Sequence, residues 1–434
     1  MVNNQHPAGS HFETIWIGEH AIGRVILKPY PLKLIQNTLM SSQNRWLLPA
    51  GIEEVLPENA RIIESYRRKC LDLFSVWGYQ LVIPPLIEFL DSLLIGDCHD
   101  LDLQTFKVTD QMSGRSMGIH ADMTPQVARI EAHRLNSDAP TRLCYCGTVL
   151  HTLPEGAGGS RSPIQIGAEL YGHTGQASDI EIITLMEATL QTCGTQTTLI
   201  DLGHTGILEA LLSQLDLSAE SHTELDSIMQ RKSTPDMVEL LAQIDCNNEL
   251  KTALVNLISL HGKYDVLERA RQQLSIGGPE VLQHIDYLQD LSQALTPRLA
   301  ISKLHYDLTE TRGYHYQHGV VFTAFCPTLG QELARGGRYD NIGESFGRAR
   351  PATGFSSDLK QLLKTATPNS AVTDQDIIFA PASADPDLHN MVNQLRDQGH
   401  IVVTGLDTAA QSIESSNCAK ILVNVDNQWI IKDK

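Results

Sequence analysis

Apolar residues recur at three- and four-residue steps between Asn59 and Trp77, and this spacing predicts an amphipathic helix. The positions of the apolar stripe are Ile63, Tyr66, Cys70, Phe74 and Trp77. Gly78 follows directly, and glycine at that place commonly ends a helix. The next segment, YQLVIPPLIEF, is typical of a strand, but Pro84 and Pro85 cannot join a central ladder. We therefore expect a long helix followed by an interrupted strand.

Strict alternation of apolar and polar residues predicts a strand in SPIQIGAELYG. One face carries Ile164, Ile166, Ala168 and Leu170, and the other carries Gln165, Gly167, Glu169 and Tyr171. Such a pattern is typical of a half-buried strand with a polar stripe. Gly167 would leave room above the sheet for a ligand, and a β-bulge at this glycine is the equally weighted alternative.

Helix and strand patterns continue along the chain. Residues 178–193 have the apolar spacing of a helix, with Ser178 as its candidate N-cap, and TTLIDLG is typical of a buried strand. Residues 216–296 are helical in pattern throughout, which predicts a helical insertion before strand patterns return in ISKLHYDL and HGVVFTAF. The Thr/Pro/Asn/Ser-rich residues 365–373 predict a linker. Residues 1–43 lack clear periodicity, and we treat them as an N-terminal leader.

The composition restricts the class of protein. A chain of 434 residues that is 42% hydrophobic and 19% charged is typical of a soluble protein with two or three domains. It has no apolar run of about 18 residues or more and no secretory signal pattern, so we expect a cytoplasmic location without membrane contact. Its 33 Lys+Arg against 51 Asp+Glu give a net charge of −18, which disfavours broad contact with nucleic acid.

Two short features suggest chemistry that the sequence does not support. Cys144 and Cys146 share a strand face, but without a neighbouring histidine or further paired cysteines they are typical of small buried hydrophobes. The loop EGAGGSRS lacks the lysine of a Walker phosphate-binding motif, so a flexible connection between strands is favoured. We expect neither a metal nor a cofactor.

Two other segments carry groups suited to a ligand. In GIHADMTPQVAR, Asp122 and Thr124 are equally suited to cap a helix that starts near Pro125 and to bind a ligand. Alternation in TRGYHYQHGVVF gives one strand face the residues Arg312, Tyr314, Tyr316 and His318. An arginine among ring hydroxyls suits a carboxylate or a phosphate.

Taken in order, these segments resemble the catalytic core of histidyl-tRNA synthetase, a class II aminoacyl-tRNA synthetase. ENARIIESYRRKCLDLFSVWGYQLVIPPLIEF resembles the first class II motif, RLCYCGTVL with SPIQIGAELYG the second, and ATGFSSDLKQLL occupies the place of the third. ETRGYHYQHGVVF and ARGGRYD resemble the two segments with which these enzymes recognise histidine. The resemblance covers about residues 44–365 and implies an α+β fold with an antiparallel sheet flanked by helices.

The resemblance also implies a histidine site. The matching positions are Asp122, Thr124, Gln165, Glu169, Arg312, Tyr316 and Tyr339. Asp122 can pair with an ammonium group, Glu169 can accept an imidazole N–H, and Arg312 can meet a carboxylate. Gln317 replaces a usual aromatic residue and His120 replaces a usual arginine, so the contacts at these two places differ from those of the synthetases.

The ATP-binding positions depart from the synthetase pattern. His151 stands where the synthetases carry an arginine that grips the α-phosphate of ATP, and Gln361 stands where the third motif carries a second arginine. Each contact of this kind to developing charge is typically worth about 10² to 10³ in rate. The resemblance, with these two losses, predicts no catalytic residue and no adenylate formation.

The C-terminal unit, residues 372–434, alternates strand and helix patterns and resembles a truncated anticodon-binding domain. Residues 371–434 contain four Lys/Arg and nine Asp/Glu, which suits RNA poorly. A synthetase core that keeps the amino-acid site but lacks the ATP-binding arginines and an RNA-binding surface resembles the regulatory subunits of ATP phosphoribosyltransferase.

That resemblance implies a protein that is not itself an enzyme. It implies L-histidine as the effector, the short-form catalytic subunit of ATP phosphoribosyltransferase as the partner, and a dimer that joins a hetero-octamer. The partner would be activated by the complex and inhibited when histidine binds. Two alternatives stay open: a divergent histidyl-tRNA synthetase-like ligase and a tRNA-sensing synthetase-like domain. Histidine-dependent pyrophosphate exchange would identify the first, and a gel shift with tRNA the second.

Overall fold

A computed structural model describes most of the chain. The described residues are 46–94, 99–154, 159–196, 198–310, 319–327, 330–340, 344–365, 377–406 and 418–434, with the backbone of 12–17 and 20–26. The chain divides into two compact units, Met1–Glu53 and Glu54–Lys434. In the first unit, strand β1 (Phe12–Ile17) pairs antiparallel with β2 (His20–Ile26), which the hydrophobic pattern of residues 1–43 does not predict.

The second unit is built on a nine-stranded sheet with the order β10-β11-β9-β12-β13-β14-β8-β7-β3. Its strands are β3 (Gln80–Leu81), β7 (Thr141–Thr148), β8 (Ile164–Tyr171), β9 (Thr198–His204), β10 (His261–Gly262), β11 (Ser302–Asp307), β12 (Val320–Cys326), β13 (Gln331–Arg338) and β14 (Ala352–Asp358). Only the pairs β11–β9 and β3–β7 among these are parallel. The observed α+β architecture with a mainly antiparallel sheet confirms the expected fold class.

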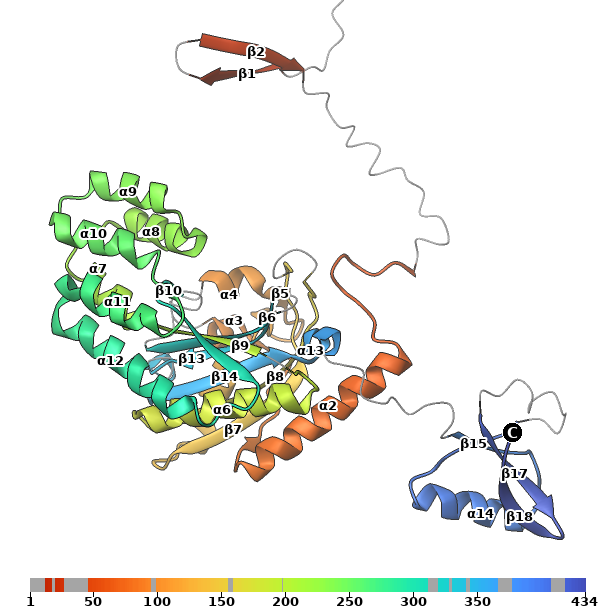
Figure 1. The fold of residues 1–434 in the computed structure, drawn as a ribbon. Helices are drawn as coiled ribbons and strands as arrows, with labels where there is room; N and C mark the ends of the chain where they lie inside the picture. Colours follow the sequence, from red (N-terminus) through yellow and green to blue (C-terminus); the bar gives the residue numbers. More distant parts are fainter. Residues whose placement is uncertain are drawn as a thin grey trace, which may run out of the picture. The chain divides into compact units, whose positions relative to one another are not determined.

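Helices cover one face of this sheet. Figure 1 shows α2 (Pro57–Val76), α6 (Gln176–Thr192) and α12 (Gly278–Leu295) along that face, and α13 (Leu359–Thr365) follows β14. The predicted amphipathic helix is confirmed as α2. Its buried residues are Ile63, Tyr66, Cys70 and Phe74. Phe74 meets Phe355 of β14 edge to face at 6.1 Å, which fixes the helix on the sheet.

Two local expectations have different outcomes. The interrupted strand is confirmed, because β3 and β4 (Ile87–Phe89) lie on either side of the two prolines. Ser178 as the N-cap of α6 is wrong, since the helix begins at Gln176 and Gly175 is its N-cap. The Ser178 hydroxyl instead donates to the Gly175 carbonyl at 2.8 Å, inside the first helical turn.

The block of residues 216–296 contains a series of helices. They are α8 (Ala219–Arg231), α9 (Thr234–Gln243), α10 (Asn248–Leu257), α11 (Asp265–Gln273) and α12, preceded by α7 (Thr205–Leu212). Side chains of Ser218 and Asn247 cap α8 and α10. The short strand β10 also belongs to this block and adds an edge to the large sheet, an element that the helical pattern does not predict.

Smaller elements complete the molecule. Strands β4, β5 (Phe106–Thr109) and β6 (Ser116–Ile119) form a three-stranded sheet, near α3 (Leu90–Leu93), α4 (His99–Gln104) and α5 (Thr124–Ile130). A π-helical turn, Glu131–Leu135, continues α5. None of the described helices is long and apolar enough to cross a bilayer.

The C-terminal part has its own sheet and core. Its strands β15 (Ile377–Ala380), β16 (Ile401–Thr404), β17 (Lys420–Val425) and β18 (Gln428–Asp433) have the order β16-β15-β17-β18, with α14 (Pro386–Asp397) against one face. Leu388 and Val392 of α14 pack with Ile378 and Leu422 of the sheet in a separate hydrophobic cluster. The described part of this unit is thus a small α/β domain.

Candidate functional site

A buried carboxylate lies on the face of the large sheet that α6 does not cover. Glu169 of β8 is 1% exposed and accepts hydrogen bonds from three hydroxyl groups. Tyr339 donates to Oε2 at 2.5 Å, and Thr124 and Tyr145 donate to Oε1 at 3.1 and 3.0 Å. A carboxylate has about four lone-pair directions, and these three hydrogen bonds occupy three of them.

The protonation of Glu169 depends on its burial. Loss of contact with water raises its pKa from 4.5 to about 8, although the hydrogen bonds from the Tyr339, Tyr145 and Thr124 hydroxyls favour the charged form. A cationic or N–H-donating ligand would favour the carboxylate further. The site is therefore suited to a basic group such as an ammonium or an imidazole.

A second carboxylate and an amide lie next to Glu169. Gln165 Nε2 donates to Asp122 Oδ1 at 2.7 Å, and Gln165 Oε1 accepts from the Met123 backbone N–H at 3.0 Å. Asp122 Oδ1 also accepts from the Thr124 backbone N–H at 3.0 Å, just before helix α5. The residues Asp122, Thr124, Gln165, Glu169 and Tyr339 are thereby joined in one hydrogen-bond network.

The two hypotheses for Asp122 and Thr124, helix capping and ligand binding, do not exclude each other in this structure. Asp122 makes the local turn that starts α5, while Thr124 is the first residue of the helix rather than its cap, a position assigned to Met123. The Thr124 hydroxyl is directed to Glu169 instead of to the helix backbone. Thr124 therefore belongs to the network as well as to the helix.

The expectation of a half-buried β8 with room above Gly167 is wrong. Both faces are buried from Ile166 onward, because α6 covers one face and a second hydrophobic cluster covers the other. A Cβ built on Gly167 would lie 2.5 Å from the Tyr145 hydroxyl and 2.5 Å from the Phe355 carbonyl oxygen. The space that glycine leaves is filled by the Tyr145 ring, not by a gap for a ligand.

Sequence reasoning did not include Tyr145 and Tyr171 among the site residues. In the β7–β8 register Tyr145 is opposite Gly167, and Leu143 is opposite Glu169. Residues directly opposite in an antiparallel pair share a face, so the register gives Tyr145 the face of Glu169. Tyr171 follows Glu169 on that face, and its hydroxyl oxygen lies 3.3 Å from that of Tyr339. Alternation along each strand indicates which residues share a face, but the pairing of β7 with β8 is needed to place Tyr145 on the face of Glu169.

Two predicted site residues, Arg312 and Tyr316, lie outside the described residues, together with Tyr314, Gln317 and His318. The chain is described again from Gly319, directly before β12. The Gly319 backbone N–H donates to the Thr205 hydroxyl at 2.9 Å, which joins the start of β12 to the start of α7.

The two positions that carry arginine in the synthetases have ordinary structural contacts. His151 is buried, and its Nε2 bonds to the Ala121 carbonyl oxygen at 2.9 Å. Gln361 Nε2 donates to Gln331 Oε1 at 2.8 Å. Its neighbour Lys360 is buried and directs its ammonium group to the Ser162 hydroxyl at 3.1 Å.

His120, which replaces another usual arginine, forms a hydrogen bond through each of its ring nitrogens. Its Nδ1 bonds to Gln126 Oε1 at 2.6 Å, and its Nε2 bonds to the Thr148 carbonyl oxygen at 2.9 Å. Both ring nitrogens therefore serve to hold α5 against β7. No nitrogen of this ring is directed to the Glu169 network.

The cysteine pair packs as small apolar side chains. Cys144 lies in the main hydrophobic cluster with Cys70 and Cys193, and Cys146 packs against it. Burial raises the pKa of the Cys144 and Cys146 thiols to about 12, which makes thiolate chemistry unfavourable. Among the described residues, no group of three or more His, Cys, Asp and Glu side chains could hold a metal ion.

Comparison with known proteins identifies two matching families. The family described as Histidyl-tRNA synthetase matches residues 51–362. The family described as ATP phosphoribosyltransferase subunit HisZ C-terminal domain matches residues 375–432. The first match extends over the large sheet with its helices, and the second over the small α/β domain.

Curated relatives match almost the whole chain. The ATP phosphoribosyltransferase regulatory subunit of Thioalkalivibrio sulfidiphilus is 49% identical over 395 residues, which is 91% of this chain and 100% of the relative. The protein of the same name from Methylococcus capsulatus is 50% identical over 380 residues, covering 86% and 94% of the two chains.

Solved structures share the fold. A crystal structure described as an ATP phosphoribosyltransferase regulatory subunit/histidyl-tRNA synthetase from Bacillus halodurans aligns with a TM-score of 0.74 and 26% identity, covering 87% of this chain and 98% of the other. The histidyl-tRNA synthetase from Nostoc sp. aligns with a TM-score of 0.71 at 18% identity, over 89% of this chain and 94% of its own. The latter similarity concerns the fold alone, which is that of class II synthetases.

Proposed function

Because the chain belongs to the family of ATP phosphoribosyltransferase regulatory subunits and so has a regulatory role in histidine biosynthesis, we propose that it binds histidine at the Glu169 network and thereby controls a short-form catalytic subunit. In this proposal complex formation raises the activity of the partner, and histidine lowers it. The ligand must bind two states of the complex unequally, since equal affinities would shift nothing.

The observation that carries the proposal is the buried Glu169 with its three hydroxyl donors and its one remaining acceptor position. An imidazole N–H fits that position, because Glu169 is an acceptor held rigidly in a site from which water is excluded. Asp122, held by Gln165, offers a carboxylate for the α-amino group. Arg312 and Tyr316 complete the proposed site by the resemblance to the synthetases alone.

We also assign the loss of synthetase chemistry to this chain. Developing phosphate charge requires cationic groups, whereas His151 bonds to a backbone carbonyl and Gln361 is neutral. Lys360, the cation nearest in sequence to Gln361, is buried and bonded to Ser162. The names of the relatives imply a separate catalytic subunit as the partner, and the chemistry would take place there.

A dimer within a hetero-octamer is the proposed assembly. Large apolar side chains are exposed on both sides of the edge strand β3, with Val76 81% exposed before it and Ile83 83% exposed after it in the single chain. Exposed apolar residues beside an unpaired strand edge are typical of a surface that another chain covers. This supports association through the segment that resembles the first class II motif.

The decisive experiment is reconstitution with the short-form catalytic subunit and a histidine titration of turnover. We expect activation on mixing and inhibition by histidine, and Glu169→Ala should remove the histidine response while activation is kept. Gln361→Ala is the matched control, because it changes a degenerate ATP position and should leave the response unchanged. Unchanged turnover on mixing would overturn the proposal.

A second measurement tests the loss of ligase chemistry. Histidine-dependent exchange of pyrophosphate into ATP should be absent for the isolated chain, and a gel shift with tRNA at physiological salt should show no complex. Measurable exchange would show that the chain is a divergent ligase, and a tRNA complex would favour the sensing alternative.

A further inference from the structure

The Glu169 network is joined through the sheet to a second buried polar cluster on the opposite face. Tyr339, which donates to Glu169, directly follows Arg338, the last residue of β13. Successive side chains of an extended segment point to opposite faces, so Arg338 is directed away from the site and toward α6. Any displacement of Tyr339 therefore acts on the backbone that carries Arg338.

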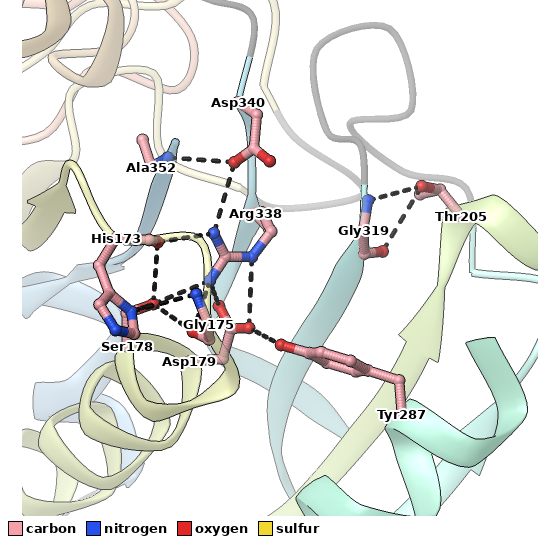
Figure 2. A network of polar contacts seen from close by, with 10 residues as sticks. All are labelled: His173, Gly175, Ser178, Asp179, Thr205, Tyr287, Gly319, Arg338, Asp340 and Ala352. Atoms are coloured by element: carbon pink, nitrogen blue, oxygen red, sulfur yellow. Dashed lines mark hydrogen bonds and ion pairs between the residues drawn. The ribbon is translucent and has the colours of Figure 1, made fainter. Parts of the chain in front are cut away.

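Arg338 is the centre of this second cluster, as Figure 2 shows. Its guanidinium group donates to Asp179 Oδ1 and to the Ser178 hydroxyl, both at 2.8 Å, and to the His173 carbonyl oxygen at 3.1 Å. The Asp179 side chain is fully buried and that of Arg338 is 7% exposed. A buried ion pair with this many partners fixes the position of both side chains.

Helix α12 is tied to the same carboxylate. The Tyr287 hydroxyl donates to Asp179 Oδ2 (Figure 2). Gln176 of α6 donates from Nε2 to the Tyr287 carbonyl oxygen at 2.9 Å. The Tyr287 ring also meets His204 edge to face at 5.6 Å. Tyr287 thus joins α12, the last helix of the helical block, to the ion pair behind the site.

Gly319, which lies directly before β12, contacts the same arginine. A Cβ built on Gly319 would lie 3.1 Å from Cβ and from Cδ of Arg338. The backbone of Gly319 therefore rests on the aliphatic part of the Arg338 side chain. Arg338 thus contacts Gly319, while its neighbour Tyr339 donates to Glu169.

The remaining acceptor position of Glu169 determines where a ligand acts. Thr124 and Tyr145 both donate to Oε1, so the free position is on Oε2, the atom to which Tyr339 donates. A ligand N–H bound there lies beside the Tyr339 hydroxyl and competes with it or displaces it. Tyr339 is therefore the residue of the network whose position depends most directly on occupancy.

We propose that Tyr287, through Asp179 and Arg338, transmits occupancy of the Glu169 site to helix α12. The hydrogen bond between the Tyr287 hydroxyl and Asp179 is present in the ligand-free state and broken in the ligand-bound state. Breaking that bond is tolerable, because Asp179 stays paired with Arg338. The inference rests on the proposed function, since it concerns how histidine bound at that site reaches the rest of the regulatory subunit.

Tyr287→Phe tests this route, because it removes the hydroxyl and keeps the ring against His204. Tyr264→Phe is the matched control, since Tyr264 belongs to the same helical block and its ring meets only Tyr306 among the described aromatic side chains. Both variants are measured as full chains, alone and with the short-form catalytic subunit. Histidine affinity comes from calorimetry, and inhibition from the ratio of turnover without and with saturating histidine.

We expect Tyr287→Phe to bind histidine within about 2-fold of wild type. The ratio of its turnover without histidine to that with histidine should be at least about 5-fold smaller than in wild type, which is the lower end of common allosteric couplings. By reciprocity, the catalytic subunit should change the histidine affinity of wild type but not of Tyr287→Phe. Backbone amides of α12 should exchange hydrogen faster when histidine binds to wild type, because the helix then loses its hydrogen bond to Asp179, and this difference should vanish in the variant.

Three results would overturn the inference. The first is inhibition of Tyr287→Phe equal to that of Tyr264→Phe, and the second is loss of histidine binding by Tyr287→Phe. The third is an unchanged hydrogen-exchange rate of the α12 amides when histidine inhibits the wild-type complex. A wild-type chain that neither binds histidine nor changes turnover would instead overturn the proposed function, and this inference with it.

Discussion

The Tyr145 hydroxyl donates a 3.0 Å hydrogen bond to Glu169, and the Tyr145 ring occupies the space beside Gly167 where a Cβ would otherwise lie. One tyrosine thus fills the space left by the glycine and stabilises the charge of the carboxylate. The relationship connects packing with electrostatics, because the same ring that excludes water from Glu169 also supplies one of its three donors.

Tyr145→Phe should weaken histidine binding without unfolding the protein. The variant keeps the ring over Gly167 but removes one donor to Glu169, which costs about 1 kcal/mol, or roughly 5-fold in affinity. Calorimetric titration of histidine measures the change. Tyr66→Phe in helix α2 is the control and should bind histidine as wild type does; equal affinities for the two variants would contradict the role of Tyr145.

Gly167→Ala should destabilise the fold far more than Gly147→Ala. The added methyl group of Gly167→Ala would lie 2.5 Å from the Phe355 carbonyl oxygen, a backbone atom that cannot move freely. Overpacking of this kind costs about 1–3 kcal/mol. At Gly147 the nearest atoms belong to the flexible Met123 side chain at 3.5 Å, which is ordinary contact. Urea denaturation of both variants checks the difference, and similar midpoints would count against the packing described.

The stability of the protein should depend on pH through Glu169. Its pKa is about 8 in the folded protein and 4.5 as the ordinary value, so between these values the folded state holds a proton that the unfolded state has lost. The contribution of Glu169 to the free energy of unfolding therefore falls as pH rises from 4.5 to about 8, by up to about 1.4 kcal/mol per pH unit.

Glu169→Gln removes the titrating group and should lose this contribution. Urea denaturation of wild type and variant at pH 5.5, 6.5 and 7.5, each without histidine, should show the variant gaining stability relative to wild type as pH increases. Stability curves that run parallel over this range would mean that Glu169 titrates below it.

Asp179→Ala should destabilise the protein much more than Glu181→Ala on the same helix. Removing Asp179 leaves the buried Arg338 without its counter-charge, which typically costs about 3–5 kcal/mol. Glu181 pairs with Arg142 in a partly exposed setting, with side chains 24% and 36% exposed, and such pairs contribute about 0–1 kcal/mol. Denaturation midpoints decide between them, and equal losses would show that the Arg338 pair contributes little.

The local elements of this protein follow from its sequence. The apolar stripe of α2 and the proline break between β3 and β4 need only backbone sterics and side-chain periodicity. The alternation of β8 likewise placed Gln165 and Glu169 on one face, and the structure has them on the side away from α6. Thr124 and Tyr339 were found through resemblance to a known family, because nothing in their local pattern indicates that they meet Glu169.

Tertiary structure alone decided what surrounds those residues. That Tyr145 covers Gly167, that β8 is buried on both faces, and that Arg338 pairs with Asp179 across 159 positions of the chain all depend on strand order and helix packing. The pattern of one strand records which face each residue takes, but not which neighbours cover that face. Burial, and with it the raised pKa of Glu169, is set by those neighbours, since the free energy of a charge depends on everything that replaces its water.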